Sequence, residues 1–182
     1  VANIDCRQDG AKLEATLRQS YLFNTSFAGL DAADVVLLVG CNPRWEAPVL
    51  NARLRRLWMS NNLRVASVGG TYDLTYPVEH LGPGANVLEA IADGSHAFAQ
   101  VLKETKRPAI ILGAGAVARS DGAAVLNLAA RIAAATGMIG PAGSADEGGW
   151  NGFNVLHGAA SRDRKSTRLN SSHITISYAV FC

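Results

Sequence analysis

The chain has few cysteines, and they lie far apart. Its 182 residues include three, Cys6, Cys41 and Cys182, and none of them forms a CxxC pair. A disulfide framework, a zinc site or an iron–sulfur cluster usually requires two such pairs or a run of closely spaced ligands. We therefore expect no metal site in this chain. Cys6 and Cys41 are predicted to be small buried hydrophobic residues.

Long hydrophobic runs are also missing. No apolar segment approaches the roughly 20 residues that a membrane-spanning helix needs, so we expect no membrane span. The chain opens with residues 1–5, Val-Ala-Asn-Ile-Asp, and this opening lacks the basic and then apolar segments of a signal peptide. It also lacks an initiator Met, and we therefore expect the N-terminus of a longer protein to be missing.

The last 19 residues, 164–182, contain no glycine, no proline and no acidic residue. This stretch resembles adapter or vector read-through, and we expect it to be a non-native tail. The alternative is a genuine strand over residues 174–181, which are rich in β-branched and aromatic residues. The whole chain has 17 basic and 15 acidic residues, but only 14 basic residues remain without Arg164, Lys165 and Arg168. The resulting net charge of −1 gives no support to nucleic-acid binding.

The remaining sequence alternates between short apolar runs and helical patterns. Hydrophobic residues make up 48% of the chain, enough for one domain with a buried core. Continuous apolar runs predict buried parallel strands over residues 34–40, 64–70 and 108–113, with a possible earlier strand over 3–6. Helical patterns cover residues 48–59, 85–92, 96–104 and 121–135, the last with Asp121 as its N-cap. The prediction is a doubly wound, mostly parallel, Rossmann-like α/β fold with helices on both faces.

We divide the chain accordingly. Residues 1–136 are expected to form a partial α/β domain, and residues 137–163 a Gly-rich loop and a continuing segment of the same domain. Residues 150–157 are predicted to be loop or linker anchored by Trp150 and Phe153. Residues 164–182 are the expected non-native tail.

The loop after the strand at 34–40 is the most informative motif. Ligands of open α/β sheets bind at the carboxyl ends of strands, where the next helix points its amides outward. Gly40 allows close approach, Asn42 can cap a helix and Pro43 stiffens the turn. Arg44 could hold a phosphate or carboxylate. The alternative is that Arg44 pairs with Glu46 or a neighbouring acid and only fixes the loop.

Other residues that could carry chemistry have simpler interpretations. Residues 113–118, Gly-Ala-Gly-Ala-Val-Ala, look like a dinucleotide loop, but no acid follows at the required distance, which favours a tight strand-to-helix turn. Asp73 and Glu79 could act as acid and base, although a loop role fits better. The arginines at 53, 55 and 56 are predicted to form a solvated or subunit-facing helix surface. The scattered histidines, His80, His96 and His157, show no metal-ligand spacing.

A family resemblance emerges from the order of these motifs. The segments that carry it are residues 18–25, 28–29, 31–48, 51–55, 73–76, 80–82, 95–104, 119–124 and 154–157. Together they resemble the molybdopterin-oxidoreductase-type domain of the large iron–sulfur subunit of proton-pumping NADH:quinone oxidoreductase, respiratory complex I. The resemblance covers roughly residues 1–162 in the correct order and spacing.

The resemblance implies a structural role for this domain. It implies that the intact subunit carries 2Fe–2S and 4Fe–4S clusters through a cysteine-rich region absent here, so we expect no catalytic residue and no cofactor in this chain. Gly40, Asn42, Pro43 and Arg44 would then be the relic of a nucleotide site. Expected partners are other subunits of the complex I peripheral arm, on the cytoplasmic side of a bacterial inner membrane or the matrix side of the mitochondrial one.

Two other functions stay open at this point. The first is a catalytic molybdopterin enzyme of the formate dehydrogenase or nitrate reductase type, in which the loop at 40–44 holds a guanine-dinucleotide cofactor. The second is a stand-alone nucleotide-binding module. The metal content of the intact subunit discriminates the first, and nucleotide titration discriminates the second.

Overall fold

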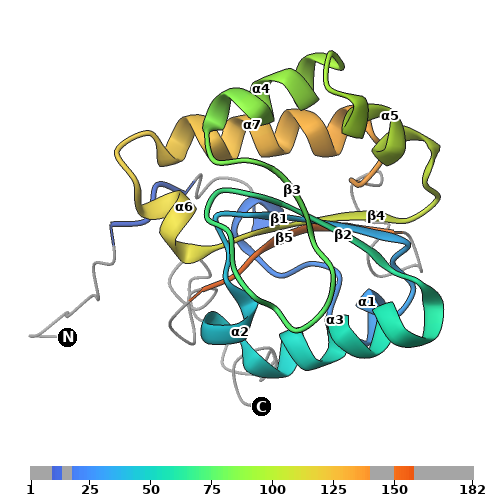
Figure 1. Cartoon of the computed structure of the whole chain (residues 1–182). Helices are drawn as coiled ribbons and strands as arrows, with labels where there is room; N and C mark the ends of the chain where they lie inside the picture. The colour runs from blue at the N-terminus through green and yellow to red at the C-terminus, as the bar shows by residue number, and fades with distance from the viewer. Residues whose placement is uncertain (1–9, 14–17, 140–149, 158–182) are drawn as a thin grey trace, which may run out of the picture.

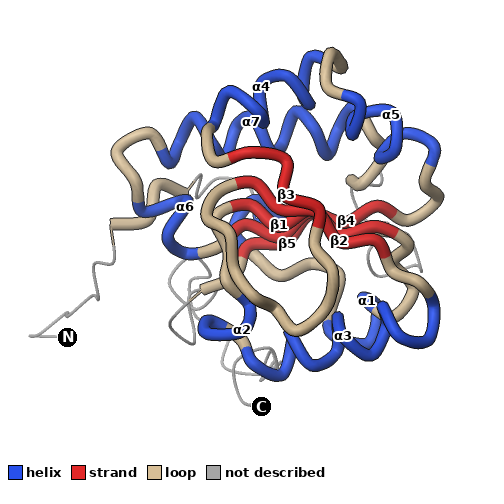
Figure 2. Tube along the Cα trace, viewed as in Figure 1, coloured by secondary structure: helices blue, strands red, loops and turns tan. Residues whose placement is uncertain are grey.

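The computed structural model describes residues 10–13, 18–139 and 150–157. Within them, five strands form one sheet in the order β3-β2-β1-β4-β5, and all four neighbouring pairs are parallel. The strands are β1 (Val35–Val39), β2 (Arg64–Val68), β3 (Glu79–Gly82), β4 (Pro108–Leu112) and β5 (Phe153–Val155). The predicted doubly wound parallel α/β fold is therefore confirmed (Figures 1 and 2).

Helices cover both faces of the sheet. The helical elements are η1 (Arg18–Tyr21), α1 (Phe27–Leu30), α2 (Pro43–Glu46), α3 (Pro48–Asn61), α4 (Ala85–Asp93), α5 (Ala97–Glu104), α6 (Ala114–Ala118) and α7 (Gly122–Ala135). Figure 1 shows α4, α5 and α7 on one face, and α1, α2 and α3 on the other. The helices expected over 48–59, 85–92, 96–104 and 121–135 are thus present with small shifts of their ends.

The central strand β1 contributes to both layers of the core. Every residue of β1 is buried. Because side chains alternate across a strand, Leu37 packs in the cluster that includes Leu88 of α4, whereas Leu38 packs in the cluster that includes Leu54 of α3. Burial on both faces explains why this segment reads as a continuous apolar run.

Asp121 lies at the predicted N-cap position of α7 but does not cap the helix through its side chain. Its carboxylate instead accepts hydrogen bonds from the Arg119 guanidinium at 2.7 and 2.9 Å. Asp121 is therefore the N-cap residue, as predicted, but its carboxylate binds the neighbouring guanidinium rather than a helix amide.

The prediction of loop or linker over residues 150–157 is wrong for Phe153–Val155, which form β5. Here Asn154 is fully buried and exchanges two hydrogen bonds with Thr25. The Thr25 amide donates to Asn154 Oδ1 at 2.9 Å, and Asn154 Nδ2 donates to Thr25 Oγ1 at 2.8 Å. Phe23 also forms an antiparallel bridge with Asn154. The segment before α1 thus lies along the side of β5 that β4 does not occupy.

Trp150 is a predicted anchor, and the structure confirms it. Its indole N–H donates to the carbonyl of Pro108 at 2.8 Å, which attaches the segment before β5 to the start of β4. Several other expected features lie outside the described residues. They are the strand over 3–6, the burial of Cys6, most of the Gly-rich segment and the tail from 164. None of the helices in the described ranges combines the length and the hydrophobicity that a membrane span requires.

His157, just after β5, makes the fold sensitive to pH. Its Nε2 contacts the carbonyl of Tyr21, and burial lowers the pKa of the imidazole below the usual 6.5. The unfolded chain therefore binds this proton more tightly than the folded chain, so folding stability falls as the pH drops below about 6.5. We expect the free energy of unfolding in urea to be lower at pH 5.5 than at pH 7.5, and the difference to shrink in His157→Gln. An unchanged difference in that variant would assign the pH dependence to other groups.

Candidate functional site

The candidate site lies at the switch point of the sheet, where the order in which the chain adds its strands reverses. From β1 the chain continues to β2 and β3 on one side, and it then returns to β4 and β5 on the other. In open α/β sheets, the crevice at this switch point, outside the carboxyl ends of the strands, is the usual ligand site. Gly40–Arg44 follows β1 and residues 113–116 follow β4, so the two loops face each other there (Figure 1).

The two loops are packed in direct contact. A Cβ on Gly113 would lie 2.2 Å from the Gly40 carbonyl oxygen and 2.7 Å from Cys41 Cα, and a Cβ on Gly40 would lie 2.8 Å from the Ala116 Cβ. The Gly113 amide donates to the Val39 carbonyl at 2.9 Å. Gly40 also has a φ of +52°, which favours glycine. Glycine in this loop therefore serves close packing of one loop on the other.

Asn42 and Pro43 begin the short helix α2. Asn42 stands at the N-cap, but its side chain does not cap; its backbone amide donates to Glu46 Oε1 at 2.6 Å. Its Oδ1 is buried without a hydrogen-bond partner among the described residues. Pro43 is buried at the first helical position, where a proline is well tolerated. Asn42 thus stands at the N-cap position, as the sequence indicated, and makes no capping hydrogen bond through its side chain.

Arg44 is paired with an acid, as one of the two alternatives expected, and the acid is Asp73. Its Nη1 donates to Asp73 Oδ2 at 2.8 Å and to the Asp73 carbonyl at 2.9 Å. The other oxygen, Oδ1, accepts from the Thr75 amide at 2.9 Å. The Thr75 amide, and after it Arg44, lower the pKa of Asp73. Arg44 thus attaches the loop after β1 to the loop between β2 and β3.

A buried polar contact, which the sequence did not reveal, attaches the loop between β2 and β3 to helix α3. Asn51 of α3 is 7% exposed; its Nδ2 donates to the Leu74 carbonyl at 3.2 Å, and its Oδ1 accepts from the Tyr76 hydroxyl at 3.0 Å. Burial raises the pKa of the Tyr76 hydroxyl above its ordinary range. The sequence offers one signal for this contact: Asn51 directly follows Leu50, a core residue of α3, and a polar residue there needs a buried partner.

Removing the Tyr76 hydroxyl tests how strongly this contact holds the loop. Tyr76→Phe leaves the buried Asn51 Oδ1 without its donor, and we expect it to lower the free energy of unfolding by about 1–2 kcal/mol. Tyr72→Phe is the matched control, because Tyr72 lies in the same loop with 46% of its surface exposed. Urea denaturation of both variants measures the difference. Equal midpoints would show that the contact contributes nothing.

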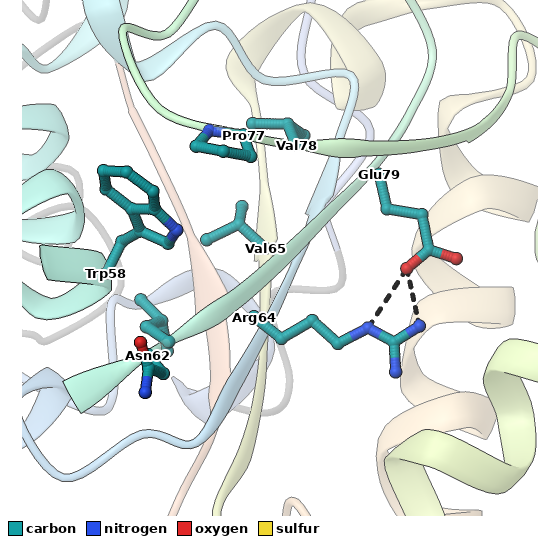
Figure 3. A pocket seen from close by; sticks show the side chains of 8 residues that line it. Trp58, Asn62, Arg64, Val65, Pro77, Val78 and Glu79 are labelled. Atoms are coloured by element: carbon teal, nitrogen blue, oxygen red, sulfur yellow. Dashed lines mark hydrogen bonds and ion pairs between the residues drawn. The ribbon is translucent and has the colours of Figure 1, made fainter.

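The other candidate acid, Glu79, is also engaged in an ion pair. Glu79 Oε2 accepts from the Arg64 guanidinium at 2.7 and 3.1 Å, on the rim of an open cleft of about 560 Å³ (Figure 3). This cleft lies at the start of β2 and β3, at the sheet edge opposite the loop at Gly40–Arg44. The acid–base hypothesis for Asp73 and Glu79 therefore gains no support, because each faces an arginine.

The histidines and the described cysteine serve separate local contacts. His96 Nδ1 accepts from the Phe98 amide at 3.1 Å and caps α5, and His80 Nδ1 lies 3.4 Å from the Ser67 hydroxyl. Cys41 is buried, as predicted, and burial raises the pKa of its thiol. Among the described residues, no three His, Cys, Asp or Glu side chains gather in a metal-binding group.

The arginines of α3 differ from the prediction in one respect. Arg53 is not simply solvated: its guanidinium donates to both oxygens of Asp31, at 2.7 and 3.0 Å. Arg56 donates to Asp31 Oδ2 at 2.8 Å. These two arginines, and Arg53 foremost, lower the pKa of Asp31. The acid that follows α1 therefore ties α1 to α3.

Comparison with known proteins gives consistent matches. The family model for molybdopterin oxidoreductase matches residues 1–179. The G subunit of NADH-quinone oxidoreductase from Rickettsia conorii (strain ATCC VR-613 / Malish 7) is 40% identical over 159 residues, which cover 87% of this chain and 23% of that protein. The same protein of Rickettsia bellii (strain RML369-C) is 41% identical over 159 residues, with 87% and 22% covered. NADH dehydrogenase [ubiquinone] iron-sulfur protein 1, mitochondrial, of Solanum tuberosum is 42% identical over 154 residues, with 85% and 20% covered.

The chain spans between 20 and 23% of the length of these curated relatives. It has the parallel sheet that the family resemblance implied, with the Gly-Cys-Asn-Pro-Arg loop at the carboxyl end of β1. The family model covers nearly the whole chain. This chain belongs to the molybdopterin oxidoreductase family.

Proposed function

We propose that this chain is a structural domain of the large iron–sulfur subunit of NADH-quinone oxidoreductase, and that it supplies packing surface rather than redox chemistry. The identity of 40 to 42% with the two rickettsial proteins and with the mitochondrial iron-sulfur protein 1, over most of the chain, carries this proposal. The intact subunit would take part in electron transfer from NADH to quinone. Its neighbours would be other peripheral-arm subunits, on the cytoplasmic or matrix side of the membrane.

The loop at Gly40–Arg44 does not fit a molybdopterin nucleotide between β1 and β4. The Gly40 carbonyl and the Cys41 Cα already occupy the space beside Gly113, where not even a methyl group would fit. Arg44, the side chain best suited to a phosphate, is held by Asp73. The open acceptor, Asn42 Oδ1, would not be satisfied by a phosphate oxygen, which is itself an acceptor. These contacts favour a packing role for the loop.

The cysteines of this chain support a location of the iron–sulfur clusters in other parts of the subunit. Such clusters are held by four cysteine thiolates, or by two cysteines and two histidines in some cases. The chain has three cysteines far apart in sequence, and Cys41 is buried in the apolar cluster with Leu38 and Leu50. We therefore propose that any cluster of the intact subunit is bound by other parts of it.

Purification of the full-length protein from its host membranes tests the assignment. We expect it to co-purify with NADH:quinone oxidoreductase activity, with iron present and with molybdenum and tungsten far below one atom per chain. Molybdenum or tungsten near one atom per chain would support the rival function, a catalytic molybdopterin oxidoreductase. Purification without other components of NADH:quinone oxidoreductase would contradict the proposal as a whole.

Nucleotide titration tests directly whether the loop at Gly40–Arg44 leaves room for a nucleotide. Titration of the chain with NAD, ATP or GTP, followed by calorimetry, is expected to show no binding tighter than about millimolar, which corresponds to roughly −4 kcal/mol. The physical reason is that the Gly113 amide, which could face a phosphate at a switch point, donates to the Val39 carbonyl instead. A micromolar dissociation constant for any of the three nucleotides would overturn the packing role.

A further inference from the structure

The outward side of α3 carries exposed apolar side chains beside its arginines. Four residues, Val49, Ala52, Arg56 and Met59, follow one another at intervals of three, four and three, so they form one stripe along the helix. Val49 is 39% exposed and Met59 is 68% exposed, and Ala52 between them is exposed as well. We call these four residues, together with Arg55, the α3 outer face. Its apolar members lie on the helix surface away from Leu50, Leu54 and Leu57, which pack in the core.

An exposed aromatic residue lies directly before this helix in the chain. Trp45 of α2, directly before α3, is 82% exposed, and Figure 1 shows α2 continuing into the start of α3 along the same side of the sheet. Tryptophan and methionine are enriched in the cores of protein interfaces. Exposed apolar side chains that line up in this way indicate a contact surface rather than a solvated helix.

The α3 outer face also carries uncompensated positive charge. Helix α3 contains three arginines and no acidic residue. Asp31 is shared between Arg53 and Arg56, and Arg55 forms no hydrogen bond or ion pair with any described residue. Asp31 therefore offsets part of the charge of Arg53 and Arg56, and the charge of Arg55 has no acidic partner among the described residues. A second copy of the same face would meet it with like charge, which is unfavourable, so the complementary surface is acidic.

We infer that the α3 outer face docks an amphipathic helix with acidic residues beside its apolar stripe, and that this helix belongs to the same subunit but lies beyond the present chain. The inference rests on the proposed function. The intervals of three and four residues match the spacing at which one helix packs its side chains against another. The small Ala52 at the centre allows the two backbones to approach closely. In the relatives, more than three quarters of the polypeptide lies outside the matched segment, and tethering favours a partner in the same chain.

Crosslinking in the full-length subunit, within its purified complex, identifies the occupant. The photoreactive residue p-benzoylphenylalanine replaces Ala52, and mass spectrometry locates the crosslinked peptide after irradiation. We expect a peptide of the same polypeptide, outside residues 1–182, with acidic residues on a helical pattern. Crosslinks to another subunit, to a second copy of the subunit, or none at all would each overturn the inference. If the subunit assembles with NADH:quinone oxidoreductase and the crosslink still goes elsewhere, the inference fails while the proposed function stands.

A matched pair of charge reversals tests the electrostatic part. Arg55→Glu places a carboxylate against the acidic partner, and we expect it to reduce the yield of the residue-52 crosslink about tenfold, equivalent to roughly 1.4 kcal/mol. Lys103→Glu makes the same charge change on α5, which covers the opposite face of the sheet (Figure 1), and it should leave the yield unchanged. Equal yields in both variants would overturn the acidic partner. Reversal of an acidic residue in the crosslinked peptide should restore the yield in Arg55→Glu and not in Lys103→Glu.

Discussion

Gly113→Ala is expected to lower the free energy of unfolding by about 3 kcal/mol, at the upper end of the usual cost of overpacking. The added methyl group would meet the Gly40 carbonyl oxygen at 2.2 Å and the Cys41 Cα at 2.7 Å. Both are backbone atoms and cannot rotate away as a side chain would. The loops after β1 and β4 must therefore separate, and the hydrogen bond from the Gly113 amide to the Val39 carbonyl is strained at the same time.

Gly115→Ala is the matched control two residues further on. A Cβ there meets its nearest atom, the Gly40 oxygen, only at 3.9 Å. Because Gly115 lies within α6, alanine should be neutral or stabilise by up to about 1 kcal/mol. Urea denaturation of the two variants gives the comparison. If both variants unfold at the same concentration of urea, the loops after β1 and β4 are not closed on each other. A ligand could then enter between these two strands.

Asn154→Ala is expected to destabilise the chain by a similar amount, about 3 kcal/mol. The side chain is fully buried, and it donates to the Thr25 hydroxyl and to the Gly152 carbonyl while accepting from the Thr25 amide. Truncation removes three hydrogen bonds and leaves the Thr25 amide unsatisfied in the interior. An unsatisfied buried group costs about 1–3 kcal/mol, beyond the roughly 1 kcal/mol net value of a single hydrogen bond.

Two measurements separate this effect from a general loss of stability. Asn61→Ala, at an exposed position near the end of α3, should change the urea midpoint little. Hydrogen exchange should show faster exchange of the Thr25 and Val155 amides in Asn154→Ala than of amides in β1. Unchanged exchange at Thr25 would mean that the segment before α1 is held on β5 by other contacts.

The strands predicted from the sequence are the ones buried on both faces. Val35–Val39 and Pro108–Leu112 are continuous apolar runs because helices cover both sides of the sheet there. Strand β3 is exposed over Glu79 and His80 and has no such run. Strand β5 places Asn154 in the interior, and a buried asparagine is acceptable only because Thr25, distant in sequence, satisfies it. Hydrophobic patterns carry no information about such distant partners.

The candidate site also combines features that local sequence predicts with contacts between distant residues that it does not. Local chemistry placed the loop at Gly40–Arg44 at the carboxyl end of β1, since a glycine after a buried strand and a proline at a helix start are local signals. The identity of Asp73 as the partner of Arg44 was not predictable, because the two are 29 residues apart and meet only through the return of the chain between β2 and β3. The Asn51–Tyr76 contact depends on that same return.

The pairing of Thr25 with Asn154 can form only late during synthesis on the ribosome. The two residues are separated by 129 positions, so at about 5–20 residues per second the earlier one is made roughly 6–26 s before its partner exists. During that interval β1, β2 and β4 can already associate, while the segment before α1 has nothing to pair with. The nascent chain therefore exposes Phe23 and Thr25 until β5 emerges, and a chaperone that acts on this protein would be expected to bind there.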